Sequence, residues 1–227
     1  MIIIPAIDLP HPGQPGPGKA RHPRDVIREW EWLGFQRVQL VEPASRNDRP
    51  LNRRQAEELL RDVHIDVQVA GDIRSADDIE QLSNAGATSV VLGSRALDEP
   101  EWLASSVTSF PDLLVVETAA RERRIRSRGL VRTLPVDVRD LADELSVFPL
   151  GGLLITFVTD APIEHADLAL VEDLTERLPF PVLVSGGVQT LATLRDLEFR
   201  GVSATIIDAA RLADTFDEQT LARSFVD

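Results

Sequence analysis

Two carboxylate residues stand at the ends of apolar segments that have the composition of buried strands. Asp8 ends the N-terminal segment IIIPAID, and Glu117 ends the segment LLVVE at residues 113–117. Two carboxyl groups on opposite sides of a substrate suit general acid/base catalysis, because one gives a proton while the other takes one. The structural alternative for each is a helix cap or an ion pair with a nearby arginine. We predict that Asp8 and Glu117 are catalytic.

Glycine-rich turns follow three other strand-like segments. These turns contain Gly71, Gly93 and Ser94 in the first half of the chain, and Ser185, Gly186 and Gly187 in the second. Glycine lets the backbone approach a ligand closely, and exposed backbone N–H groups attract anions. The turns are therefore candidate ligand-binding segments.

The turns belong to an internal repeat. Residues 67–97 and 182–212 align without a gap, and Gly71 falls on Gly186 while Gly86 falls on Gly201. Each copy has the pattern of a strand, a glycine turn, an amphipathic helix, a glycine and a second strand. Two such copies, half a chain apart, predict a fold built from two similar halves.

The elements that must position these residues alternate along the whole chain. Strands are expected near residues 2–8, 37–42, 67–70, 89–93, 113–117, 152–156 and 181–185, and before Asp208. Helices are expected between them, for example at 53–63 with Asn52 as its cap, after the capping residue Ser75, and at 137–147. Residues 120–132 are rich in arginine and are expected to form a two-stranded hairpin that turns near Ser127.

Continuous apolar strands indicate a sheet that is covered on both faces, and strand–helix alternation indicates parallel strands. Eight such units predict one α/β domain, a (β/α)8 TIM barrel with half-barrels at roughly 1–111 and 112–227. An open, doubly wound sheet is the alternative. Active sites of TIM barrels lie at the C-terminal ends of the strands, where strands one and five face each other.

The charge and composition of the chain argue against several classes of binding partner and site. The formal charge of −13 argues against nucleic acid and anionic membranes, and no apolar run has the length of a membrane span. The absence of cysteine excludes disulfides and thiolate metal sites, and the four histidines lack ligand spacing, so no metal site is predicted. The N-terminus shows no leader, which predicts a cytoplasmic protein, and we expect a monomer or a small homo-oligomer that uses no cofactor.

The cationic residues of two loops each allow two interpretations, as ligand contacts or as solvated surface residues. Lys19, in the Pro/Gly-rich loop after Asp8, is either a contact for a phosphate or carboxylate of the ligand or a solvated loop residue. The arginines of residues 121–132 either close over an anionic ligand or form a solvated charged hairpin.

Four motifs together resemble the HisA/HisF family of histidine and related biosynthesis: IIPAIDL, VQVAGDIRS, VVLGSRAL and VSGGV. The resemblance covers essentially the whole chain. It implies an isomerase that converts a phosphoribosylformimino-aminoimidazole-carboxamide ribotide by an Amadori rearrangement. It also implies that Asp8 and Glu117 match the two catalytic acids and that Thr156, near the second acid, belongs to the catalytic set. It further implies that the glycine-rich turns of the two halves bind a small anionic or phosphorylated metabolite. One carboxyl would open the sugar ring as an acid, and the other would take the C2 proton.

Several positions depart from the family pattern. Asp72 stands where the family has glycine, Asp208 and Ala209 replace Gly-Arg, and Leu130 replaces tryptophan. A carboxylate close to a phosphate is repulsive in a low-dielectric cleft, so both phosphate sites are predicted to be weakened, the second one more. Two alternatives follow: a HisA-related protein of tetrahydromethanopterin biosynthesis, and a non-catalytic binding or scaffold descendant.

Overall fold

The computed structural model describes residues 1–9, 21–42, 53–71, 73–121, 124–126, 133–159 and 161–226. Expectations for Lys19, Asn52, Asp72, Ser127 and Leu130 therefore lie outside the described residues.

Eight parallel strands form a closed ring. They are β1 (Ile2–Asp8), β2 (Arg37–Val41), β3 (Asp66–Ala70), β4 (Ser89–Leu92), β5 (Leu114–Arg121), β8 (Gly152–Phe157), β9 (Val182–Ser185) and β10 (Ala204–Asp208). Neighbours pair in that order, the β4–β5 pairing joins the two halves, and β10 pairs with β1. The closure confirms the predicted TIM barrel, and the open-sheet alternative is wrong.

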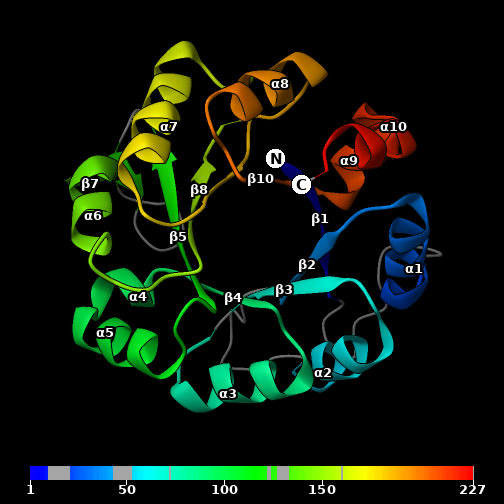
Figure 1. Cartoon of the computed structure of the whole chain (residues 1–227), viewed down its shortest axis with the longest axis horizontal. Coiled ribbons are helices and arrows are strands. Elements are labelled where there is room, and N and C mark those ends of the chain that lie inside the picture. The colour runs from blue at the N-terminus through cyan, green and yellow to red at the C-terminus, as the bar shows by residue number, and fades with distance from the viewer. Residues whose placement is uncertain are drawn as a thin grey trace.

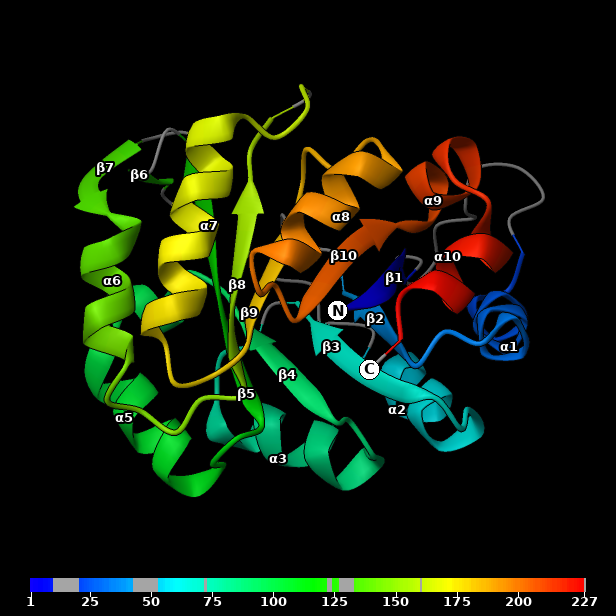
Figure 2. The same cartoon turned by 45° about the horizontal axis from the view of Figure 1, so that its top comes forward.

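Helices surround the ring (Figures 1 and 2). They are α1 (Pro23–Leu33), α2 (Arg53–Asp62), α3 (Ala76–Ala85), α4 (Arg95–Asp98), α5 (Pro100–Ser109), α6 (Val138–Leu145), α7 (His165–Arg177), α8 (Leu191–Phe199), α9 (Ala209–Thr215) and α10 (Glu218–Ser224). The start of α3 shows how local sequence sets these boundaries. The Ser75 hydroxyl accepts the N–H of Asp78 at 3.1 Å, and the Asp78 carboxylate accepts the N–H of Ser75 at 2.9 Å. This reciprocal capping box satisfies helix N–H groups that have no partner within the helix.

The core has two layers, because successive residues of a strand point to opposite faces. One layer fills the barrel and includes Ile2, Ile4, Val115, Leu154 and Ile206. The other layer lies between the barrel and the helices. It consists of the outward-facing strand residues and the buried faces of the helices. The barrel interior is therefore packed. Inward-facing side chains nearer the C-terminal ends of the strands lie beyond this packed region, at the barrel mouth.

Strand β5 is longer than the sequence suggested. The prediction that it ends at Glu117 is wrong, because β5 continues to Arg121 and pairs with β8 as far as Ala120. It then pairs with the antiparallel strand β6 (Arg124–Arg126), which pairs with β7 (Thr133–Asp137). The structure has a three-stranded antiparallel extension where a two-stranded hairpin was expected, because β7 covers residues 133–137, of which only Asp137 had been assigned, as the start of a helix.

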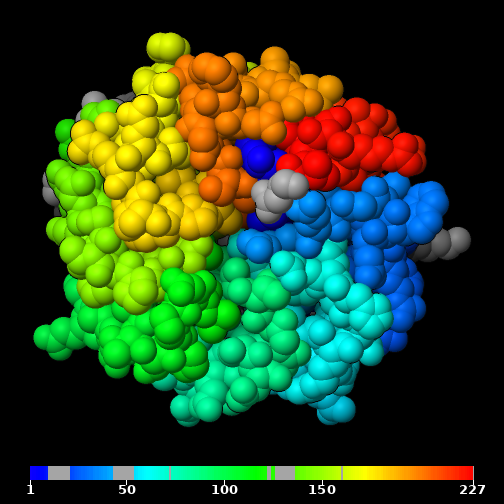
Figure 3. Space-filling model, viewed as in Figure 1, coloured from blue at the N-terminus to red at the C-terminus, as the bar shows by residue number. Residues whose placement is uncertain are grey.

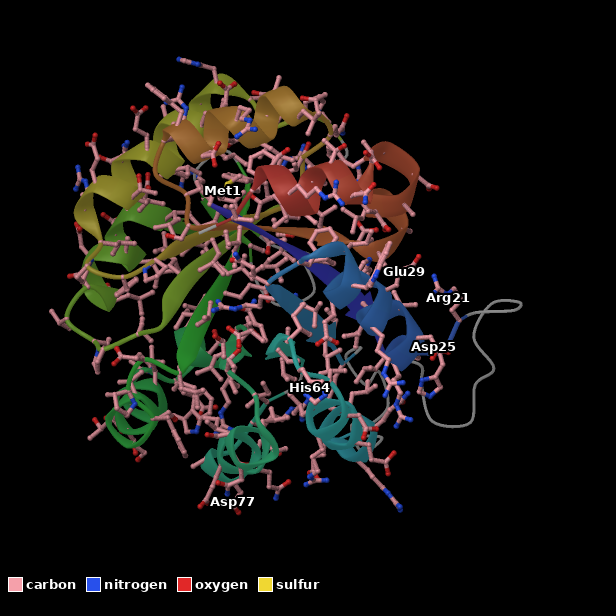
Figure 4. The ribbon with its side chains drawn as sticks, turned by 45° about the vertical axis from the view of Figure 1, so that its right-hand side comes forward. Met1, Arg21, Asp25, Glu29, His64 and Asp77 are labelled. Atoms are coloured by element: carbon pink, nitrogen blue, oxygen red, sulfur yellow. The ribbon has the colours of Figure 1, made fainter. Side chains whose placement is uncertain are left out.

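The surface carries most of the charge. Figure 4 shows Arg21, Asp25 and Glu29 around α1 and Asp77 at α3 on the outside of the molecule, while Met1 lies near the middle. In the space-filling view, packed side chains surround the N-terminal segment, which is visible in blue at the centre (Figure 3). No helix in the described ranges has the length and apolar character needed to cross a membrane.

Candidate active site

Asp8 and Glu117 lie on opposite sides of the barrel. In the ring, β1 and β5 are four strands apart in either direction (Figure 1). Asp8 follows the inward set of β1, which includes Ile4, and Glu117 follows the inward Val115 of β5. Both carboxylates therefore belong to the inward faces of opposing strands. This arrangement permits acid/base chemistry from two sides of a ligand, whereas the catalytic roles themselves stay predictions.

Thr156 meets Glu117 directly. The Thr156 hydroxyl donates a 2.8 Å hydrogen bond to Oε1 of Glu117 from the neighbouring strand β8. Both side chains are half-buried. The bond orients the carboxylate and leaves its other oxygen for a further partner. The structure thus brings Thr156 and Glu117 together, and the catalytic role of each stays a prediction.

A cavity of about 490 Å³ opens at the C-terminal ends of β1, β9 and β10. Its lining includes predicted site residues, namely Asp8, Ser185, Gly186, Gly187, Asp208 and Ala209. The other predicted residues that the structure describes, namely Glu117, Thr156, Gly71, Gly93 and Ser94, do not line this cavity. The structure therefore groups Asp8 with the second-half glycine turn, and it leaves the first-half turn at a separate place on the ring.

The turn after β9 requires both of its glycines. Gly186 and Gly187 have φ angles of 79° and 67°. A Cβ on Gly186 would lie 2.1 Å from the backbone oxygen of Phe157, and one on Gly187 would lie 2.8 Å from Cγ1 of Ile163. Neither glycine donates its N–H to another residue in the described part of the chain. The turn thus offers two backbone donors beside the cavity.

Asp208 caps the helix that follows β10. Its Oδ1 accepts the N–H of Arg211 at 2.8 Å, and its Oδ2 lies 3.7 Å from Nε of the same arginine. Both residues line the cavity. The carboxylate therefore stands at the start of α9, where the resemblance led us to expect glycine and a binding site for phosphate.

The first-half turns differ from each other. A Cβ on Gly71 would lie 2.7 Å from Cβ of the buried Glu42, so glycine is required there for packing. A Cβ on Gly93 would meet open space, and the Ser94 side chain makes no capping bond. Only the turn at Gly93 therefore leaves room for a ligand to approach the backbone.

Three polar residues of the cavity lining were not predicted from the sequence: Gln39, Thr159 and Arg211. Gln39 is a polar residue inside an apolar strand, and Nε2 of Gln68 donates to its Oε1 at 2.6 Å. Gln39 lies two residues before Val41, which faces the barrel interior, so the alternation of side chains along β2 could have identified it. Arg211 had a weaker signal, since it lies three residues after Asp208 on the helix that Asp208 caps. The described residues contain no group of three or more side chains able to hold a metal.

Comparisons with known proteins show the family to which the chain is similar. The family model described as "Histidine biosynthesis protein" matches residues 2–217. A protein of Gemmatimonas aurantiaca is 35% identical, with 99% of both chains covered. A protein of Gloeothece citriformis is 30% identical, with 92% of this chain and 87% of the relative covered. A protein of Myxococcus xanthus is 29% identical, with 99% of both chains covered.

All three relatives are named as an imidazole-4-carboxamide isomerase, with two phosphoribosyl groups in the name, and none of these names refers to tetrahydromethanopterin. The family match covers nearly the whole barrel, including β1 with Asp8 and β5 with Glu117. The chain belongs to the histidine biosynthesis protein family.

Proposed function

We propose that the chain is an isomerase that performs an Amadori-type rearrangement on a ribosyl-amine metabolite, with Asp8 and Glu117 as its acid/base pair. The observation that carries this proposal is the placement of the Thr156–Glu117 hydrogen bond on the inward face of β5 and β8, opposite Asp8 on β1. The names of the relatives support the reaction class.

The proposed reaction is an intramolecular rearrangement that breaks the ring C1–O bond and relocates protons, and it therefore needs no external oxidant or reductant. One carboxyl group protonates the ring oxygen of the ribose as the C1–O bond breaks, which gives an open-chain iminium. The other, as a carboxylate, removes the proton from C2, and the resulting enolamine tautomerises to the amino-ketose. Thr156 holds Glu117 in one orientation during these steps, which is how a positioned side chain gains efficiency in proton transfer.

The ligand is proposed to be anionic or phosphorylated, and the contact expected for its anion is the turn at Gly93 and Ser94. Open space at Gly93 allows a phosphate to approach the backbone, and the Ser94 hydroxyl makes no hydrogen bond within the described residues. Arg95, the next residue, is turned toward Glu99 at 2.8 Å and stacks on the Trp102 ring at 4.7 Å. Backbone and hydroxyl groups, rather than this arginine, would therefore hold the anion.

Isomerase turnover tests the proposal directly. The purified chain would be incubated with the family's phosphoribosylformimino ribotide and with its derivatives that lack one phosphate, and aldose-to-ketose conversion would be followed by NMR. We expect conversion of at least one of these compounds. A folded protein that binds one of them and converts none would exclude the isomerase.

A non-catalytic binding protein is the second candidate, and Asp208 is the observation that favours it. Its carboxylate lines the cavity in which the ligand would be held. This candidate predicts ligand binding without conversion, and the same experiment separates it from the isomerase.

A further inference from the structure

The β10 end of the cavity already contains an anion, the Asp208 carboxylate. Anions bind at helix starts because the first N–H groups of a helix have no partner within it. Oδ1 of Asp208 takes one of these groups, the N–H of Arg211, at 2.8 Å. A phosphate at the same place would have to displace a side chain that is tethered to the adjoining backbone.

The charge of the cavity lining is also unfavourable for a phosphate. Among the described lining residues, the charged side chains are Asp8, Asp208 and Arg211, which gives two carboxylates and one guanidinium. The Arg211 guanidinium already faces Oδ2 of Asp208 at 3.7 Å. A phosphate dianion beside Asp208 would be repelled by the like charge of the carboxylate. Arg211, the cation that could neutralise the phosphate, is already paired with Asp208.

The same groups suit a sugar hydroxyl. The Asp208 side chain is 64% exposed, so its carboxylate can accept a hydrogen bond from a donor in the cavity in addition to its contacts with Arg211. Gly186 and Gly187 supply N–H groups beside the same cavity. A hydroxyl group is both donor and acceptor, so it can donate to the carboxylate and accept from a backbone N–H at once. A phosphate dianion can only accept.

We propose that Asp208 is a specificity-determining residue that makes the β9–β10 end of the cavity bind an unphosphorylated, hydroxyl-bearing ribosyl group in place of a phosphate. The sugar class rests on the proposed isomerase function, whereas the exclusion of phosphate rests on Asp208 and Arg211 alone. The ligand would then carry its phosphate only at the other end, near Gly93.

A different arrangement would give the opposite specificity. Arg211 could leave Asp208 and hold a phosphate against the Gly186–Gly187 turn, with Asp208 serving only as a helix cap. The two arrangements differ in the effect of removing each charge. In our proposal, loss of the Asp208 charge creates phosphate binding, whereas in the alternative, loss of the Arg211 charge abolishes phosphate binding that the native chain already has.

The test is an NMR titration of the isotope-labelled full chain with inorganic phosphate and, separately, with methyl β-ribofuranoside. In the native chain we expect the riboside, and not phosphate, to shift the Gly186 and Gly187 amide signals. The variant Asp208→Ser keeps a good helix cap and loses the charge. We expect it to bind phosphate at these glycines at least tenfold more tightly than the native chain.

The matched control is Asp137→Ser, because Asp137 caps α6 by accepting the N–H of Arg139 at 3.0 Å and does not line the cavity. It should leave phosphate binding unchanged. Native-chain phosphate binding at Gly186 and Gly187 that is lost in Arg211→Gln would overturn the proposal, as would an Asp208→Ser variant that binds phosphate no more tightly than the native chain. These readouts require no turnover, so they stand apart from the isomerase assay.

Discussion

The hydrogen bond between Thr156 and Glu117 is the contact on which the proposed chemistry depends at the scale of single residues. A carboxylate on a flexible side chain samples several orientations, and a fixed donor selects one of them. At 2.8 Å the Thr156 hydroxyl is well placed to do this. We therefore predict that Thr156 is a positioning residue that acts through Glu117.

Thr156→Val removes the hydroxyl while keeping the shape of the side chain. We expect kcat of the isomerisation to fall roughly tenfold, about 1.4 kcal/mol, because a hydrogen bond to a charged group is lost. KM should change less, because Thr156 does not line the described cavity. Steady-state kinetics measure both constants. Thr156→Ser should restore kcat, and equal kcat in the Val and native enzymes would remove the positioning role.

At the scale of elements, the turn from β9 to α8 holds the second-half site in place. Gly186 and Gly187 pack against the chain that leads from β8 to α7, and the N–H of Ile163 donates to the Gly187 oxygen at 3.1 Å. The glycines are therefore structural as well as candidate ligand contacts.

Gly186→Ala should destabilise the fold by about 3 kcal/mol, because the new Cβ meets the Phe157 oxygen and the φ angle is unfavourable for alanine. Gly93→Ala is the matched control, since its Cβ would enter open space and its φ is not positive. Denaturant unfolding compares the two. Equal stability of both variants would contradict the packing of the β9 turn.

Helices α6 and α7 are joined by an ion-pair network centred on Asp173. Arg139 of α6 and Arg177 of α7 both contact its carboxylate, the latter at 2.8 Å. Burial alone would raise the pKa of Asp173, but the hydrogen bonds and charges of the two arginines outweigh it and hold the pKa below its ordinary value. A folded-state pKa below the unfolded one stabilises the fold above the unfolded pKa, and this stabilisation is lost as the pH falls through the folded pKa.

Asp173→Asn should therefore lower the free energy of unfolding by about 1 kcal/mol at neutral pH, as expected for a partly exposed pair. The difference from the native chain should shrink as the pH falls below about 3.9, the ordinary pKa of aspartate. Unfolding curves over a pH series measure it. The control is Asp143→Asn, an exposed position on α6. A difference that grows at low pH would contradict the assigned sign.

The sequence was sufficient for the order of the elements and insufficient for their lengths. Apolar runs and glycine turns located the eight barrel strands, and the Ser75–Asp78 pair located the start of α3. The end of β5 was predicted wrongly because Glu117 was taken as the last residue of the strand. A polar residue within a barrel strand can point into the mouth while the strand continues. Arg211 was missed because its proximity to Asp8 depends on the pairing of β10 with β1, which no local pattern encodes. Gln39 was missed because the alternation of inward and outward residues on β2 was not used.

At the scale of the whole molecule, ring closure fixes how distant parts of the chain face each other. Asp8 comes from the first strand and Glu117 from the fifth, and a closed ring of eight strands places these two strands opposite each other. The half-barrel origin of the fold, at roughly 1–111 and 112–227, stays a prediction. It would explain why each half supplies one carboxylate and one glycine-turn site.

The measurement that tests this account most directly is kcat for isomerisation in Asp8→Asn and Glu117→Gln, compared with the native chain. Each variant keeps the size of the side chain and removes its ability to exchange a proton. We predict that each lowers kcat at least ~100-fold, as expected for loss of a general acid or base, while circular dichroism and thermal unfolding stay native-like. Native kcat in either folded variant would contradict the assignment of the acid/base pair.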